Sequence, residues 1–119
     1  MITEIPFVAT PVTNMHRARA FYEGVLSLKP TAVTCEGKWI EYEVGGTVFA
    51  ISNIEPDWTP SSQGTTVAFE VNDIYDVVSL LKAHGSTIFE DVFETPVCQM
   101  AIVSDPDGNK ITIHKRKAS

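Results

Sequence analysis

Two stretches of this chain carry the same order of predicted elements. Each begins with a strand-like run, continues with an amphipathic helix and ends with three more strand-like runs. The residues at the predicted helix starts, Asn14 and Asn72, are 58 positions apart, and the turn glycines of the last hairpins, Gly46 and Gly108, are 62 positions apart. Offsets this similar indicate two copies of one βαβββ unit.

The first copy has clear signals at the start of its helix. Thr13 or Asn14 can cap a helix in which apolar residues recur at helical spacing as far as Leu26. Pro6 and Pro11 indicate that the strand before this helix is short or lies at a sheet edge. The strands of this copy are predicted at residues 4–12, 31–35, 38–44 and 47–52.

The second copy follows a segment, residues 53–64, that is rich in Pro and Ser and has no apolar period, as is typical of a linker. Asn72 or Asp73 can cap the second helix, and Gly85 is placed to end it. The apolar residues of this helix fall at i, i+3, i+4 and i+7, namely Ile74, Val77, Val78 and Leu81. Its strands are predicted at residues 65–71, 86–89, 97–104 and 110–114. The chain is therefore predicted to be one domain, residues 1–119, with modules over residues 1–52 and 65–119.

The last predicted hairpin indicates which side chains face the core and which face away from it. Its turn, DPDG at residues 105–108, has a proline that fixes φ and a glycine that can adopt positive φ. Beyond the turn, Ile111 and Ile113 are predicted to face the core. The polar side chains that alternate with them are Lys110, Thr112 and His114. Because one helix covers only one face of a sheet, we expect the other faces of the two modules to line a shared cleft.

Composition limits the partners. With 9 Lys plus Arg against 15 Asp plus Glu, the formal net charge is -6, which argues against nucleic acid as a partner. No run approaches the roughly 20 apolar residues of a membrane span, so a membrane is not expected either. Cys35 and Cys98 have no CxxC or Cys/His spacing and are predicted to be buried free thiols. These features together favour a reducing, cytoplasmic setting.

At this point the sequence resembles a known family. The segment NMHRARAFYEGVLSLKP, residues 14–30, is similar to the first helix of the vicinal oxygen chelate superfamily, which includes glyoxalase I, bleomycin resistance proteins and extradiol dioxygenases. The second half, with VAFEVNDIYDVVSLLKAHG and then VSDPDGNKITI, resembles its second module. The resemblance implies an α+β, glyoxalase-like fold in which two βαβββ modules form a half-open, cleft-lining sheet.

The resemblance also identifies where metal ligands would lie. In metal-dependent members they are typically His or Gln, Glu, His and Glu, on the first and last strands of each module. The corresponding positions here are Phe7, Ala50, Thr66 and Thr112. An aromatic ring, a methyl group and two hydroxyls make no site for a divalent transition metal. The resemblance therefore implies a member with no metal and no other cofactor.

Three functions are compatible with these residues. The first is a protein of the bleomycin-resistance type that binds, and in a homodimer cleft sequesters, a small organic ligand. Its expected ligand-binding residues are Phe7, Trp39, Ala50, Thr66, Thr112 and His114. The second is a metal-free lyase or isomerase that uses a cleft carboxylate, for which Glu70 is the candidate because it shares strand parity with Thr66.

The third function is a protein-interaction module with a collapsed cleft. Trp58, in the predicted linker, would then contact a partner, or would otherwise cover a core edge. Glu70 also has an ordinary interpretation as part of a solvated strand face, and His114 as an exposed residue near the terminus. A pair between Glu70 and His114 is compatible with their parity but is not implied by spacing.

Overall fold

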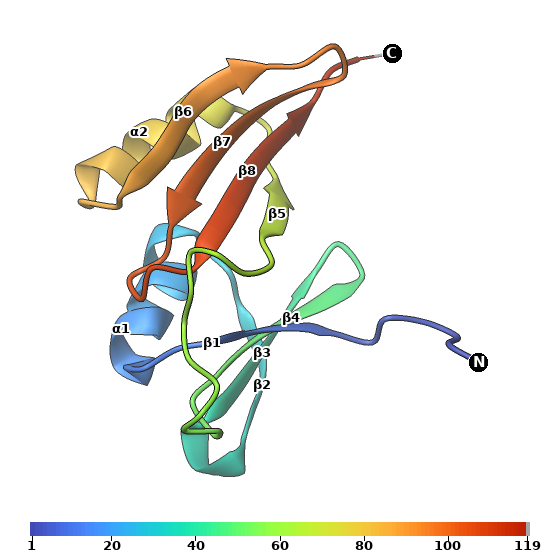
Figure 1. Ribbon diagram of the computed structural model, residues 1–119, viewed down its shortest axis with the longest axis vertical. Coiled ribbons are helices and arrows are strands. Elements are labelled where there is room, and N and C mark those ends of the chain that lie inside the picture. Colours follow the sequence, from blue (N-terminus) through green and yellow to red (C-terminus); the bar gives the residue numbers. More distant parts are fainter. Residues whose placement is uncertain (119) are drawn as a thin grey trace. The chain divides into compact units, whose positions relative to one another are not determined.

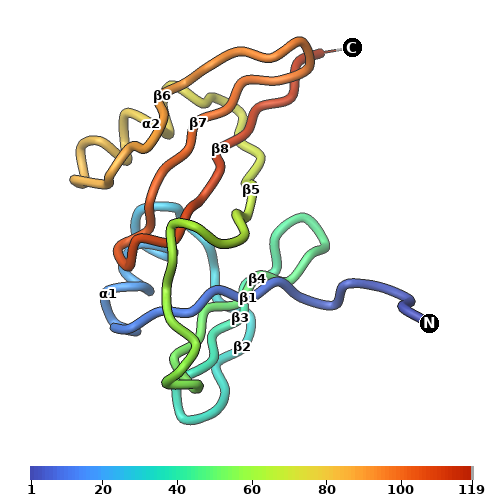
Figure 2. The backbone as a smooth tube through the Cα atoms, viewed as in Figure 1, coloured from blue at the N-terminus to red at the C-terminus, as the bar shows by residue number. Residues whose placement is uncertain are grey.

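The structure, a computed structural model, describes residues 1–118 and divides into two units. The first runs from Met1 to Pro60 and the second begins at Ser61. Each unit contains one four-stranded sheet and its own helix (Figure 1). Figure 2 follows the backbone from the blue N-terminus to the red last strand.

The first unit has a sheet in the order β1-β4-β3-β2. β1 runs parallel to β4, and the other neighbours are antiparallel. Its elements are β1 (Val8–Pro11), α1 (Met15–Arg19), a π-helical turn (Ala20–Val25), β2 (Pro30–Thr34), a 3₁₀ turn (Cys35–Gly37), β3 (Trp39–Val44) and β4 (Thr47–Ser52).

The second unit repeats this arrangement in the order β5-β8-β7-β6, with β5 parallel to β8. Its elements are β5 (Val67–Glu70), α2 (Ile74–Ala83), β6 (Ile88–Glu94), β7 (Cys98–Ser104) and β8 (Lys110–Arg116). Because both units have the same strand order and the same parallel pair, the predicted α+β fold of two βαβββ units is confirmed.

The first helix differs from its prediction. Asn14 caps it as expected, since its side chain accepts a hydrogen bond from the Arg17 backbone N–H at 2.9 Å. The α-helical part ends at Arg19, however, and a wider π-helical turn follows, in which the Leu26 N–H donates to the Phe21 carbonyl. In this turn the adjacent side chains Phe21 and Tyr22 are both buried.

The second helix has both predicted ends. The Asp73 side chain accepts from the backbone N–H groups of Tyr75 and Asp76. At the other end Gly85 has φ of 79°, and the Ser86 N–H donates to the Leu81 carbonyl. This is a Schellman ending, which requires positive φ and therefore favours glycine.

The two cores are made of different residues. In the first unit, Tyr22 packs against Tyr42 and Phe49, with ring centroids 6.5 and 5.2 Å away. In the second unit, as far as residue 118, the buried core contains no aromatic ring: besides Cys98 at the start of β7, its buried apolar residues are aliphatic, namely Ile74, Val78, Leu81, Ala101, Val103, Ile111 and Ile113. Each helix thus covers one face of its own sheet and leaves the other face free of helix.

One cysteine prediction is wrong. Cys98 is a buried free thiol as expected, but Cys35 is exposed. The reason is that β2 ends at Thr34, and Cys35 begins a tight turn with positive φ outside the sheet. Across residues 1–118, none of the helices has the length and apolar character that crossing a membrane requires.

Candidate functional site

Strand register determines which side chains lie on the helix-free face of each sheet. In the first unit, Tyr42 and Phe49 are paired across β3 and β4 on the helix side. The alternating pairs therefore lie on the other face: Trp39 with Ser52, Glu41 with Ala50 and Glu43 with Val48. In the second unit the same alternation puts Ala68, Thr112 and Ile102 in one row on the helix-free face.

An aromatic pair stands on the helix-free face of the first unit. The Phe7 ring meets the Trp39 ring edge to face, with centroids 5.3 Å apart and an interplanar angle of 88°. The Trp39 indole N–H donates to the Glu41 carboxylate at 2.8 Å, which fixes the orientation of the indole. Phe7 is 45% exposed, so this pair offers an apolar surface.

Ala50 lies on the same face, between Ala9 on β1 and Glu41 on β3. It is fully buried. A methyl group in this position contributes packing and has no atom that can hydrogen-bond to a ligand or coordinate a metal.

A hydroxyl pair joins Thr66, the residue before β5, to Thr112 on β8 in the second unit. The Thr66 and Thr112 hydroxyl oxygens are 2.9 Å apart, and the Thr66 hydroxyl donates to the Lys110 carbonyl at 3.3 Å. With the Thr66 proton used in this way, Thr112 donates to Thr66. Both hydroxyl protons therefore have acceptors within the second unit.

The structure brings Glu70 and His114 together. They are register partners on the parallel strands β5 and β8, and the His114 Nδ1 lies 2.5 Å from a Glu70 carboxylate oxygen. The other oxygen accepts from the Arg116 backbone N–H at 2.7 Å. These donors, the Arg116 N–H first and then the imidazole, lower the pKa of Glu70 below its usual range. His114 is thus held in place by an ionised carboxylate, with its side chain 24% exposed.

The side chains at the four family ligand positions do not fit a metal. Phe7 is engaged with Trp39, Ala50 is a buried methyl group, and the Thr66 and Thr112 hydroxyls are hydrogen-bonded to one another. Elsewhere in residues 1–118, no group of three or more His, Cys, Asp or Glu side chains is arranged to hold a metal ion.

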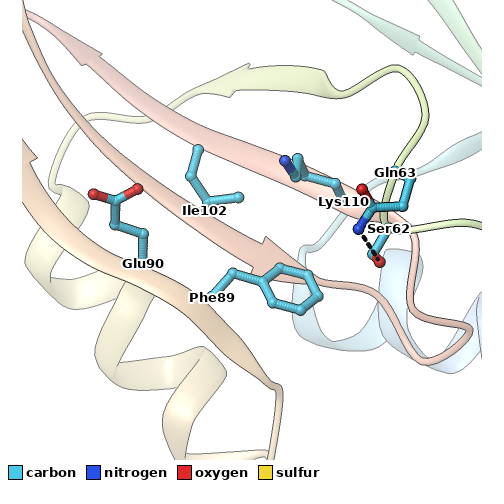
Figure 3. A pocket seen from close by; sticks show the side chains of 6 residues that line it. All are labelled: Ser62, Gln63, Phe89, Glu90, Ile102 and Lys110. Carbon is cyan, nitrogen blue, oxygen red and sulfur yellow. Dashed lines mark hydrogen bonds between the residues drawn. The ribbon is translucent and has the colours of Figure 1, made fainter.

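A pocket of about 220 Å³ opens in the second unit (Figure 3). Six residues line it: Ser62, Gln63, Phe89, Glu90, Ile102 and Lys110. Lys110 was expected on this face, whereas the other five were not predicted as site residues. The pocket exists because β6 contains a bulge: Ile88 pairs with Val103 but Glu90 pairs with Ile102, so Phe89 is an extra residue on that strand. A bulge aims two adjacent side chains to one side, and here both Phe89 and Glu90 reach the pocket.

The DPDG turn positions the other wall of the pocket. The buried Asp105 carboxylate accepts from the backbone N–H groups of Asp107 and Asn109 and from the Asn109 side-chain amide, each at 2.9 Å. The amide oxygen of Asn109 in turn accepts from the Ser61 N–H at 3.1 Å. The turn thereby ties down the segment that carries Ser62 and Gln63.

Trp58 is 38% exposed and belongs to the first unit, within a stretch that has neither helix nor strand. Its backbone N–H donates to the Glu55 carbonyl at 3.2 Å. It does not line the pocket of the second unit.

One family model covers nearly the whole chain. The family model described as Glyoxalase/Bleomycin resistance protein/Dioxygenase superfamily matches residues 4–113. A search of curated proteins gives no match.

Several solved structures have the same fold at low sequence identity. An antibiotic binding protein from Streptomyces sp. CB03234 is 22% identical, with a TM-score of 0.80 and 98% of each chain covered. A glyoxalase/dioxygenase from Nostoc punctiforme is 20% identical, with a TM-score of 0.80, and the match covers 97% of this chain and 92% of that one. A lactoylglutathione lyase from Agrobacterium tumefaciens is 14% identical, with a TM-score of 0.74 and coverage of 97% and 95%. A binding protein and a lyase both have this fold, so function depends on the side chains of the site and not on the fold alone.

Proposed function

Because the chain belongs to the glyoxalase/bleomycin resistance protein/dioxygenase superfamily, we propose that it binds a small organic molecule without a metal. The observation that carries this proposal is the chemistry of the four family ligand positions. Phe7, Ala50, Thr66 and Thr112 offer a ring, a methyl group and two hydroxyls that are already paired. Without a metal, the Lewis-acid step that polarises a substrate oxygen has no source at this position.

The surfaces that remain suit a ligand held by shape and a few polar contacts. The Phe7 and Trp39 rings give an apolar platform in the first unit, and the second unit has its own pocket. The existence of this pocket favours ligand binding over a protein-interaction module with a collapsed site. By analogy with the bleomycin-resistance type, the protein sequesters its ligand in the cleft of a homodimer, and the free thiols favour a cytoplasmic setting.

Native mass spectrometry of the freshly purified protein, with metal analysis of the same sample, tests the proposal. We expect a dimer with no stoichiometric metal and a co-purified organic mass. One tightly held divalent ion per chain would contradict the metal-free assignment. A monomer in sedimentation at micromolar concentration would contradict the homodimer.

A second candidate function is a metal-free lyase or isomerase, favoured by the Glu70–His114 pair. The lowered pKa makes Glu70 a weak base, so its role would be to orient the imidazole. With Nδ1 donating to Glu70, the ring's other nitrogen, Nε2, is left to accept a proton from a bound molecule. In this scheme His114 is the proton acceptor and Glu70 positions it.

Turnover of the co-purified ligand would separate this candidate from pure binding. We expect His114→Gln to abolish turnover while binding is retained, and Glu70→Gln to lower kcat and alter the pH profile without raising KM. A ligand recovered chemically unchanged after prolonged incubation with the protein would eliminate the enzyme.

A further inference from the structure

The pocket of the second unit has one side chain of each charge and an apolar part. Figure 3 shows the Glu90 carboxylate on one side, Ser62 and Gln63 on the other, and Ile102, Phe89 and the Lys110 side chain between them. Glu90 and Lys110 stand on β6 and β8, which are separated by β7. The two residues are separated by two inter-strand spacings across the sheet and by two residues along the strand direction. Their backbones therefore lie roughly 12 Å apart.

Neither charged group has a partner in the part of the chain that the structure describes. Among residues 1–118, the Glu90 carboxylate and the Lys110 ammonium make no hydrogen bond or ion pair, whereas Lys82 pairs with Asp91 and Lys117 with Glu94 on the same unit. Two free opposite charges that border one pocket can both be satisfied by a single molecule with the complementary charges.

The middle of the pocket sets the remaining requirements. Phe89 is 47% exposed, so its ring gains burial if an apolar group covers it. A volume of about 220 Å³ holds about seven water molecules at roughly 30 Å³ each. This is below the roughly 300–1,000 Å³ of pockets for drug-sized ligands, so the occupant is a small molecule or one end of a larger one.

We propose that this pocket binds a zwitterion: a molecule with an ammonium group for Glu90, a carboxylate for Lys110 and a short apolar segment that lies on Phe89 and Ile102. This inference rests on the proposed function, because it names the chemical class of the small organic ligand. A molecule that is neutral overall also avoids the repulsion that a net charge of -6 imposes on anions.

The probe for this pocket is 6-aminohexanoate, with hexanoate and hexylamine as matched molecules that each lack one charge. NMR titration of the full chain should show saturable binding of 6-aminohexanoate, with shifts at Phe89 and Ile102. We expect each single-charge molecule to bind at least about tenfold more weakly, which corresponds to about 1.4 kcal/mol.

Variants test the two charges separately. Glu90→Gln and Lys110→Met should each weaken 6-aminohexanoate binding about tenfold. Lys82→Met is the matched control, since Lys82 pairs with Asp91 outside the pocket, and it should bind normally. In the double variant Glu90→Lys/Lys110→Glu the charges are exchanged, and the probe should bind again in the reverse direction.

The inference would be overturned by the absence of saturable 6-aminohexanoate binding, or by equal binding of hexanoate or hexylamine. These results can be distinguished from failure of the proposed function. An uncharged organic molecule that co-purifies and binds equally to wild type and Lys110→Met would refute the zwitterion assignment and leave small-molecule binding intact.

Discussion

The two units share one topology but differ in what fills it. The first has an aromatic core in which the buried Tyr42 hydroxyl donates to Glu23, and Glu23 also pairs with Arg19. The second has an aliphatic core, to which Cys98 adds a buried free thiol. The helix-free faces differ too, with aromatic rings in the first and paired hydroxyls and charges in the second. The fold therefore depends on the alternation of apolar residues, while the particular residues are free to diverge.

The largest effect is expected from truncation of the aromatic core. Tyr22 is fully buried, with Phe21 and Phe49 ring centroids at 5.1 and 5.2 Å. Tyr22→Ala should lower the free energy of unfolding by about 3–5 kcal/mol. Urea unfolding followed by tryptophan fluorescence measures this well, because Trp39 and Trp58 are both in the first unit.

The matched change in the second unit is Leu81→Ala, also at a fully buried position. Its cost should be about 3 kcal/mol, measured by far-UV circular dichroism. If Tyr22→Ala costs no more than this, the aromatic cluster contributes no more than an aliphatic core of the same topology.

The next effect concerns the hydrogen bond between Tyr42 and Glu23 in the first unit. Burial opposes ionisation of Glu23, but hydrogen bonds from Arg19 and Tyr42 outweigh it and lower the pKa of this carboxyl. Burial and the neighbouring Glu23 raise the pKa of Tyr42, so its hydroxyl stays a donor. Tyr42→Phe should therefore cost about 1.5 kcal/mol near neutral pH, the lower end for a hydrogen bond to a charged group.

This cost should depend on pH in one direction. A folded-state pKa below the unfolded one gives stability that is present above the unfolded pKa and is lost as pH falls through the folded pKa. The gap between wild type and Tyr42→Phe should thus shrink as urea unfolding is repeated from about pH 7 down to about pH 3. Tyr75→Phe, at an exposed position on α2, is the control and should change stability little. A gap that stays constant over this range would show that Glu23 does not interact with the Tyr42 hydroxyl.

The sequence was sufficient for the topology because apolar periods and caps are local signals. Asn14, Asp73 and Gly85 lie at helix ends as predicted. The π-helical turn after Arg19 was missed because it arises from packing of two adjacent aromatic residues, which local propensity does not describe. Residues 90–94 were not predicted as strand because an edge strand carries charges that weaken the apolar alternation.

The site was less predictable, because its contacts depend on the register between neighbouring strands. Parity placed Glu70 and His114 on one face, but their contact requires the register of a parallel pair, which no hairpin turn fixes. The pocket depends on the bulge at Phe89, and a bulge changes register without a clear sequence signal when no glycine marks it. Hence strand faces could be derived from the sequence, while contacts across strands could not.

The smallest effect is expected at a position where the two units correspond. Ala50 pairs with Ala9 across the parallel strands of the first unit, as Thr112 pairs with Ala68 in the second. Only the second unit adds a hydroxyl pair there. Thr112→Val keeps the size of the side chain and removes its hydroxyl, so it should cost about 0.5–1 kcal/mol in urea unfolding.

The double variant decides whether the two hydroxyls act as a pair. Removal of both partners leaves no unsatisfied group between the threonines, so Thr66→Val/Thr112→Val should cost clearly less than the sum of the single variants. Thr47→Val, at an exposed position of β4 in the first unit, is the control for a threonine outside the pair. If the single costs simply add, Thr66 and Thr112 do not stabilise β5 on β8 through one another. The helix-free face of the second unit would then have two hydroxyls free to contact a ligand. The corresponding position of the first unit has only the methyl groups of Ala9 and Ala50, so the two faces would differ in ligand contacts as well as in strand pairing.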